Sequence, residues 1–464
     1  MKRGTRGKKA ILIMLDTLRR DFLGCYGSPW VKTPRLDALA RETAVFEDFR
    51  TASYPTVPCR RDIATGRFSF PWRGWEPLTD EHPILAQALN PRGVVTQMIL
   101  DTPHLVRHGF GFDRHFQGFW LLRGQEDDSF NTDPVNRPLP APREKLRDAP
   151  PGIYDQCLRN TVMRRTDIER DYFAPRLFEA AEEWLERNRS HEDFFLWIDS
   201  FSPHEPWETP FPYNEMYDPG YKGPRLTYPR NGRSDYATAR EHKNMVALYA
   251  GMITFVDKWV GRFIDKVKEL GMWDDTLLIV TSDHGIYLGE HGMHGKISGT
   301  LYEECVRVPF FLHHPDGRAA GRRIRGFAQH PDIMPTILDH FGVPVPESVH
   351  GSSLLPRLSP GKASRPARPF GMFSQAKGPI SWQTDRFLYV RWPRDPERIG
   401  KLKAAHLGCA GCFEDELYDL HKDPGETRNV IRKHPAAAAL DRDLRAFLAE
   451  KQAPASFFSN YGWE

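Results

Sequence analysis

Short apolar runs and amphipathic segments alternate along the chain. Continuous apolar runs, typical of buried parallel strands, occur at Ala10–Leu15, Phe194–Ile198 and Leu277–Thr281. Apolar residues at helical spacing predict helices over Ala174–Arg187 and about Tyr249–Leu270. This alternation predicts an α/β protein in which a largely parallel sheet lies between helices.

Two long segments interrupt this alternation. Residues 126–156 contain six prolines, and residues 205–243 mix Pro, Gly, Tyr and Arg without a period. Loops of this length in a compact domain often act as lids or substrate walls, and a plain surface excursion is the alternative. We expect both segments to be surface insertions.

The C-terminal part of the chain begins with a Gly- and Pro-rich stretch. A strand-like segment, Ser381–Val390, and a helical segment near Ala436–Lys451 follow it. We therefore expect a large α/β domain over residues 1–365. A smaller α+β subdomain with an antiparallel sheet should pack on it over residues 366–464.

The charge balance and the length of the apolar runs exclude several classes of protein. Lys and Arg number 64 and Asp and Glu 61, so the formal net charge is +3, a small surplus for a nucleic-acid binder. No segment approaches the roughly 18 apolar residues of a membrane-spanning helix. The basic start with its short apolar run is a poor signal peptide. We expect neither a nucleic-acid nor a membrane partner.

The cysteines indicate a reducing compartment. Six cysteines in 464 residues lack the dense spacing of a disulfide scaffold, which favours the cytoplasm and free thiols. Cys409 and Cys412 form one C-x-x-C pair, but no second pair lies nearby to complete a zinc site. We interpret this pair as chance spacing in a loop.

Polar residues that could hold a cation follow two of the predicted strands. Asp16 comes directly after the first strand, and Asp283 and His284 follow the strand that ends at Thr281. Ligands bind at the carboxyl edge of a parallel sheet, so carboxylate oxygens and an imidazole nitrogen there predict a divalent-cation site. A helix cap at Asp16 and a structural turn at Asp283 are the alternatives.

A candidate nucleophile lies in a third polar cluster. Pro58 suits an early helical position, which would put Thr56 at a helix N-terminus. Free N–H groups and the helix dipole favour an anion there and stabilise an alkoxide. Together with Asp16, Asp283 and His284, Thr56 makes a metal-activated hydroxyl nucleophile.

The same cluster resembles a signature of the sulfatase family, within the alkaline phosphatase superfamily. The family motif is C/S-x-P-x-R-x-x-x-x-T-G-R, with Thr56 here at the nucleophile position and matches at Pro58, Arg60, Thr65, Gly66 and Arg67. Other family segments recur in order at Pro203-His204, Ser282–Gly285, Gly289–Gly292 with Lys296, and Glu416–Leu420. The resemblance spans nearly the whole chain and implies a large mixed sheet between helices with a small C-terminal sheet subdomain.

The resemblance also implies a role for each matching residue of the site. Asp16, Asp283 and His284 correspond to ligands of one divalent ion, and Thr56 corresponds to the covalent nucleophile bound to the same ion. Arg60 corresponds to the arginine that supports the nucleophile. Relatives are often dimers or tetramers, so a homo-oligomer is implied.

Two further residues match positions that face the substrate. His204 and Lys296 correspond to residues that contact the transferred group and its bridging oxygen, where they could stabilise charge on the leaving group. A structural histidine and a solvated loop lysine are the alternatives.

Departures from the family bear on the substrate. Sulfatases usually carry two adjacent acidic residues where this chain has Asp16-Thr17, whereas members acting on phosphonate and phosphate esters tend to lack the second one. Thr56 cannot be oxidised to formylglycine, and Cys59 cannot replace it because Arg61 stands where the motif requires proline. Water can attack phosphorus in a phospho-threonine, so the chemistry favours phosphorus over sulfur.

Other candidates carry weaker signals. The segment containing Asp101 and His104 departs from the family's G-K-W-H segment, so both residues are candidates for substrate binding, with a packed loop as the alternative. A second metal ion would need Asp199, His204 and His330, whose spacing departs from that of two-metal relatives, and we expect one ion. The imidazole ligand favours Mn²⁺ or Zn²⁺, with Ca²⁺ and Mg²⁺ as further candidates.

The sequence therefore predicts a cytoplasmic, metal-dependent hydrolase of a small-molecule ester. The preferred substrates are phosphate diesters, phosphate monoesters or phosphonate esters, cleaved through phospho-Thr56 without formylglycine. A sulfuric ester hydrolase that uses the unmodified threonine is the alternative. A third hypothesis, an inactive binding protein with the same fold, has the retained nucleophile and metal ligands against it.

Overall fold

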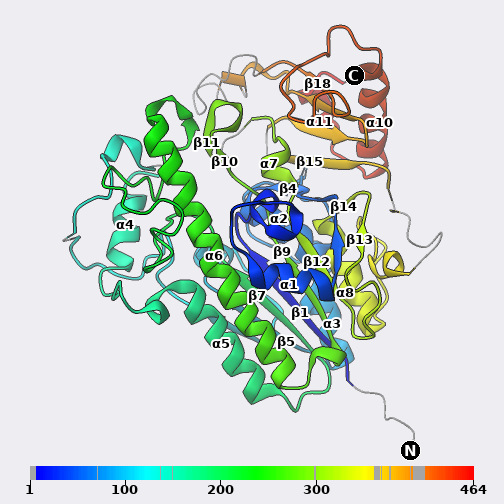
Figure 1. The fold of residues 1–464 in the computed structure, drawn as a ribbon. Coiled ribbons are helices and arrows are strands. Elements are labelled where there is room, and N and C mark those ends of the chain that lie inside the picture. Colours follow the sequence, from blue (N-terminus) through cyan, green and yellow to red (C-terminus); the bar gives the residue numbers. More distant parts are fainter. Residues whose placement is uncertain are drawn as a thin grey trace, which may run out of the picture.

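The computed structural model describes residues 7–463, except 71, 136, 149, 297–298, 360–365, 367, 376–377, 398 and 401–412. An eight-stranded sheet forms its centre (Figure 1). In sheet order, its strands are β13 (Arg323–Ile324), β2 (Ala44–Phe46), β12 (Phe310–His313), β9 (Thr276–Thr281), β1 (Lys9–Leu15), β7 (Phe194–Ser200), β5 (Val95–Leu100) and β6 (Gly118–Leu121). Strand β12 is antiparallel to β9 and β2, and the other pairs are parallel. This confirms the mixed, mostly parallel sheet.

Helices cover both faces of this sheet, because the side chains of a buried strand alternate between them. In β1, Ile11 and Ile13 pack in one core cluster, whereas Leu12 and Met14 pack in another. The helices over the first face are α1 (Pro34–Glu42), α5 (Phe173–Asn188) and α6 (Ala239–Glu269). Those over the second face are α2 (Thr56–Thr65), α3 (Leu85–Leu89) and α8 (Ile333–Phe341).

The long helix α6 begins at Ala239 rather than near Tyr249. Thr238 and Glu241 form a capping box there: Thr238 Oγ1 accepts from the Glu241 N–H at 3.2 Å, and Glu241 Oε2 accepts from the Thr238 N–H at 2.8 Å. The second predicted insertion therefore ends at Thr238. Apolar spacing missed the first turns because their side chains are mostly polar.

Thr238→Ala is expected to lower the free energy of unfolding by about 1 kcal/mol, because the Glu241 N–H loses its partner at the start of α6. Urea denaturation followed by tryptophan fluorescence measures the change. Thr238→Ser keeps the hydroxyl and is the matched control. Equal destabilisation by both variants would contradict the capping role.

A second sheet combines four strands from the C-terminal part of the chain with one strand from its N-terminal part. In sheet order, its strands are β18 (Glu416–Asp419), β17 (Phe387–Arg391), β16 (Ile380–Gln383), β15 (Gly371–Gln375) and β4 (Ser53–Tyr54). Helices α10 (Ala436–Glu450) and α11 (Ala455–Asn460) pack on it around a separate core. Strand β4 pairs in parallel with β15 and ends two residues before α2, so this sheet helps to place the start of α2.

The segment Ser381–Val390 was predicted as one strand. In the structure it forms most of a hairpin. Strands β16 and β17 are antiparallel, and the Thr384 N–H donates to the Phe387 carbonyl at 2.8 Å in the turn between them. Three polar residues, Thr384, Asp385 and Arg386, separate the two strands, and such a polar interruption is a turn signal.

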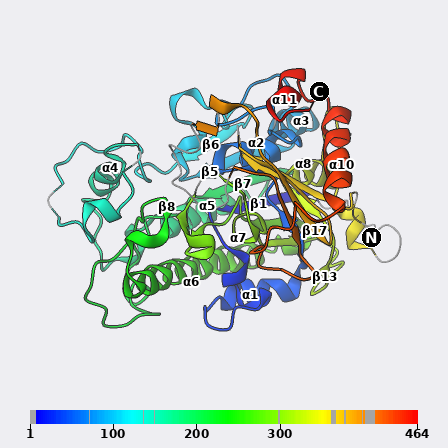
Figure 2. The ribbon, with the colours of Figure 1, turned by 90° about the horizontal axis from the view of Figure 1, so that it is seen from above.

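The two insertions lie at the side of the central sheet that carries α6. Helix α4 (Ile153–Asn160) projects with the described parts of the first insertion in both views (Figures 1 and 2). The second insertion packs tightly on α6, since a Cβ at Gly251 would lie 2.2 Å from the Tyr213 carbonyl oxygen. Its strand β8 (Gly232–Arg233) pairs with β11 (Met293–Gly295), which pairs with β10 (Tyr287–Leu288).

Two further predictions concern membranes and thiols. Within the described parts of the chain, no helix combines the length and apolar character needed to cross a membrane. The described free thiols are those of Cys25, Cys59, Cys157 and Cys305. The C-x-x-C pair, Cys409 and Cys412, lies outside the described residues.

Candidate active site

Three buried carboxylates meet at the carboxyl edge of the central sheet. Asp16 follows β1, Asp199 lies at the end of β7 and Asp283 follows β9. Strand β1 runs parallel to both β7 and β9, so the three strand ends lie side by side. The three side chains are fully buried. The topology thus brings together residues that are far apart in the sequence.

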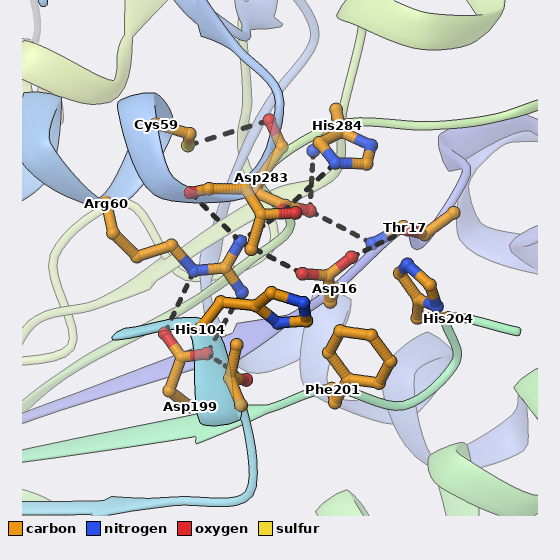
Figure 3. Close-up of polar contacts among 12 residues, drawn as sticks. Asp16, Thr17, Cys59, Arg60, His104, Asp199, Phe201, His204, Asp283 and His284 are labelled. Atoms are coloured by element: carbon orange, nitrogen blue, oxygen red, sulfur yellow. Dashed lines mark hydrogen bonds and ion pairs between the residues drawn. The ribbon is translucent and has the colours of Figure 1, made fainter. Parts of the chain in front are cut away.

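Arg60 of α2 lies among these carboxylates (Figure 3). Its Nε and Nη2 donate to Asp199 at 3.1 and 3.0 Å, while its Nη1 donates to Asp283 and lies 3.1 Å from Asp16 Oδ2. With all three carboxylates ionised and Arg60 charged, the group has a formal charge of −2. A bound divalent cation would balance this buried charge.

Asp16, Asp283 and His284 place three ligand atoms within 4.8 Å of one another. Asp16 Oδ2 and His284 Nε2 are buried and make no hydrogen bond to any described group. His284 Nδ1 lies 2.8 Å from the Gly285 carbonyl, so Nδ1 carries the proton and Nε2 presents a lone pair. These donors and the charge of −2 fit one divalent ion.

Burial and like charges perturb the pKa values of these groups. Burial raises the pKa of Asp16 well above its usual value, and the Asp283 carboxylate adds to this effect. Burial also acts to raise the pKa of Asp283, but Arg60 and His284 outweigh it and hold that pKa low. Burial lowers the pKa of His284 to about 4, so its imidazole is neutral at neutral pH, as a metal ligand must be.

Thr17 orients two of these groups, a role that the sequence analysis missed. Its N–H donates to Asp283 Oδ1 at 2.9 Å and its hydroxyl donates to Asp16 Oδ1 at 2.7 Å. Its backbone is left-handed, with φ of 66°, and the Tyr249 hydroxyl donates to its carbonyl at 2.7 Å. The position where relatives usually have a second carboxylate is thus a positioning residue here.

Thr56 is the first residue of α2 and is 4% exposed. The prediction of a threonine at a helix N-terminus is therefore confirmed. Cys59, one turn later, is fully buried and its Sγ lies 3.7 Å from the Asp283 carbonyl. Burial raises the pKa of the Cys59 thiol well above its usual value, so it stays protonated and is a poor nucleophile.

His204 and Lys296 contact each other, although they come from different loops. Lys296 Nζ lies 2.8 Å from His204 Nε2, and it donates to Glu205 Oε1 at 2.6 Å. Strand β11 ends just before Lys296, whose N–H donates to Asn231 Oδ1 at 3.2 Å. Neither a solvated lysine nor an isolated structural histidine describes this pair.

Asp101 and His104, the two candidates for substrate binding, have different surroundings. Asp101 is fully buried and accepts hydrogen bonds from the Phe201 N–H at 2.6 Å and from the Gln125 side chain at 3.5 Å, as a packed loop residue would. His104 stacks near Phe201, whose other neighbour is His204 (Figure 3). The Phe201 ring therefore lies between His104 and His204, the residue predicted to contact the substrate.

Asp199, His204 and His330, the residues considered as ligands of a second ion, each have other partners. Asp199 accepts from Arg60, Thr102 and Trp197, and His330 Nε2 lies 2.8 Å from the Ser282 carbonyl. His204 pairs with Lys296. Among the described residues, the groups that could hold an ion do not combine Asp199, His204 and His330.

His284→Ala is expected to weaken divalent-metal binding about 100-fold, because it removes the imidazole whose Nε2 faces the buried carboxylates. Titration calorimetry of the chelator-treated protein with Mn²⁺ and Zn²⁺ measures this affinity. His313→Ala is the control, since that buried imidazole bonds only the Glu42 and Trp273 carbonyls among described groups. Unchanged affinity in His284→Ala would remove this residue from the ligand set.

Comparisons with known proteins identify the family of this chain. The family model described as Sulfatase matches residues 8–343. PehA of Trinickia caryophylli, described as a multifunctional alkaline phosphatase superfamily protein, is 27% identical over 94% of this chain and 93% of its own length. An arylsulfatase of Clostridium perfringens is also 27% identical, over 93% and 92% respectively.

Solved structures show the same fold. The phosphonate monoester hydrolase of Agrobacterium radiobacter superposes with a TM-score of 0.73 at 24% identity, and the match covers 96% of each chain. The family match extends over most of the chain and includes Asp16, Thr56, Asp283 and His284. The chain therefore belongs to the sulfatase family of ester hydrolases, whose members use a divalent metal ion.

Proposed function

We propose that this chain hydrolyses phosphate diesters, phosphate monoesters or phosphonate esters through a covalent phospho-Thr56. The observation that carries the proposal is the buried threonine at the start of α2, in the nucleophile position of the family. A threonine cannot become formylglycine, so its ester has no second hydroxyl whose collapse could expel sulfate. Water can instead displace Thr56 from phosphorus.

The proposed reaction has two displacements at phosphorus. Thr56 Oγ attacks and gives its proton to solvent, its bond to phosphorus forms, the bond to the alcohol oxygen breaks, and that oxygen takes up a proton. Water then attacks the phospho-Thr56, the Oγ–P bond breaks, and a proton from that water returns to Oγ. The N–H groups at the start of α2 and the fixed charges of Arg60 and Lys296 favour an anion at this position.

The metal ion of the family would be held by Asp16, Asp283 and His284, with Thr56 as a further ligand. When bound, it would lower the pKa of the threonine hydroxyl and screen the charge of the ester oxygens. Arg60 holds the pKa of Asp283 low and lies 3.1 Å from Asp16 Oδ2, and Thr17 orients both of these carboxylates.

The relatives support phosphorus as well as sulfur chemistry. PehA is described as multifunctional, and the similar solved structures include phosphonate monoester hydrolases. The Clostridium perfringens relative is described as an arylsulfatase, and its sequence identity to this chain equals that of PehA. This relative favours a sulfuric ester hydrolase as the second candidate function.

Three p-nitrophenyl esters distinguish the two functions: bis-p-nitrophenyl phosphate, p-nitrophenyl phenylphosphonate and p-nitrophenyl sulfate. Each is assayed with Mn²⁺, Zn²⁺, Ca²⁺ and Mg²⁺ in turn. We expect kcat/KM for a phosphorus ester to exceed that for the sulfate. A higher kcat/KM for the sulfate would overturn the proposal in favour of a sulfatase that needs no formylglycine.

A further inference from the structure

A buried carboxylate lies behind the substrate-facing pair. Glu205 is fully buried, and its Oε1 accepts from Lys296 Nζ at 2.6 Å. Its Oε2 lies 3.4 Å from His204 Nδ1 and accepts no hydrogen bond from a described group. Burial acts to raise the pKa of Glu205, but His204, Lys296 and Arg147 outweigh it and lower that pKa to about 2. Glu205 is therefore an anion beside Lys296.

The two insertions meet at this carboxylate. Arg147 of the first insertion places Nη1 3.4 Å from Glu205 Oε1 and 3.7 Å from Glu126 Oε1, and Glu126 also accepts from the Tyr228 hydroxyl. Glu205 belongs to the second insertion. Side chains from two otherwise irregular segments thus form one charged network against Lys296.

The hydrogen-bond partners assign the protons of this group. His204 Nδ1 contacts the Glu205 carbonyl, which can only accept, so Nδ1 carries the proton and Nε2 accepts from Lys296. Burial lowers the pKa of His204 to about 3, which agrees with a neutral ring. Lys296 has three N–H donors; among described groups it directs one to His204 and one to Glu205.

We propose that Glu205 is a positioning residue for protonation of the leaving group. It holds the Lys296 ammonium against His204 so that the third Nζ–H is directed to the oxygen of the departing alcohol. The inference rests on the proposed function in one respect, the assignment of Lys296 to that oxygen. His204 acts as a fixed acceptor in this arrangement and not as the acid.

The step balances in atoms and charge. As the bond between phosphorus and the leaving oxygen breaks, that oxygen takes a proton from Lys296 Nζ and the alcohol departs neutral. The proton that Thr56 Oγ loses on attack passes to solvent, and the Lys296 amine takes a proton back from solvent. Glu205 stays ionised throughout and keeps its hydrogen bond from Lys296 Nζ.

The test is the dependence of kcat/KM on the leaving group, because kcat/KM reports the displacement in which the alcohol departs. Glu205→Gln and the wild type are assayed on aryl esters whose phenols range from 4-nitrophenol to unsubstituted phenol. A good leaving group needs little protonation, so we expect kcat/KM to fall about threefold for the 4-nitrophenyl ester and about 100-fold for the phenyl ester. A merely structural role would lower kcat/KM by one factor across the series.

Glu208→Gln is the matched control. Glu208 lies in the same segment and pairs with Arg164 and Arg137, and no described contact joins it to His204 or Lys296. We expect it to leave the leaving-group dependence unchanged. Lys296→Met combined with Glu205→Gln should be no slower than Lys296→Met alone, because Glu205 acts through Lys296.

The outcomes separate this inference from the proposed function. The series is run in whichever ester class, phosphorus or sulfur, the wild type cleaves, so a sulfatase result would leave this test intact. Equal fold-losses across the series in Glu205→Gln would overturn the inference. An additional loss on top of Lys296→Met would also overturn it. If Glu205→Gln does not fold, Glu205→Asp, which keeps the charge but withdraws it from Nζ, is assayed in the same way.

Discussion

Thr56→Ala is expected to lower kcat/KM for the preferred ester by about 10⁴-fold or more, because the covalent route loses its only nucleophilic oxygen. Thr56→Ser keeps a hydroxyl at the start of α2 and should retain activity within about tenfold. Steady-state assays on bis-p-nitrophenyl phosphate and on the phenylphosphonate ester measure both variants. Activity that survives in Thr56→Ala would show that another group attacks phosphorus.

A covalent intermediate gives a second readout for Thr56. Rapid acid quenching during turnover of a phosphorus ester should leave a phosphoryl mass increase on the peptide that contains Thr56, and Thr56→Ala should lack it. Thr56→Cys would complete the C-x-P-x-R pattern with Pro58 and Arg60. Produced with a formylglycine-generating enzyme, this variant is expected to gain turnover of p-nitrophenyl sulfate.

Arg60→Met is expected to lower the free energy of unfolding by about 3–5 kcal/mol, because it leaves fully buried carboxylates without their common partner. Urea denaturation of the metal-loaded protein measures the loss. Arg60→Lys should be intermediate, since it keeps the charge but not the two parallel bonds to Asp199. A loss below about 1 kcal/mol in Arg60→Met would contradict this account.

A double variant isolates the pair of Arg60 and Asp199. Asp199 has only neutral partners besides Arg60 among described groups, namely Thr102 and Trp197. Adding Asp199→Asn to Arg60→Met removes the charge that the first substitution leaves unpaired. The double variant should therefore be destabilised by less than the sum of the single variants, with a coupling of about 1–3 kcal/mol. Additive losses would show that the two side chains act independently.

Much of the fold and of the candidate site could be predicted from local patterns. The runs at β1, β7 and β9 are apolar throughout, as strands buried on both faces must be, so their positions were predicted correctly. Asp16 and Asp283 directly follow such strands, and parallel pairing then brings them to one edge. The start of α2 at Thr56 was also predicted, because proline suits the first turn of a helix.

Patterns failed where a polar residue, and not apolar spacing, determines the structure. The start of α6 depends on the capping box at Thr238, and the hairpin between β16 and β17 depends on a three-residue polar turn. Both signals are short. The spacing of apolar residues over a longer window does not detect them. Helix α6 was therefore predicted too short, and the hairpin of β16 and β17 was predicted as one strand.

By itself, the sequence predicted the main strands and helices, the candidate nucleophile and the candidate metal ligands, because each of these signals depends on residues close together in the chain. Only the tertiary structure decided which charged side chains lie next to the residues of the site. Arg60 lies among Asp16, Asp199 and Asp283, and Lys296 meets Glu205, because the sheet and the insertions bring distant segments into one buried volume. Electrostatic interactions in such a volume depend on distance in space and on burial, which no spacing along the chain reveals.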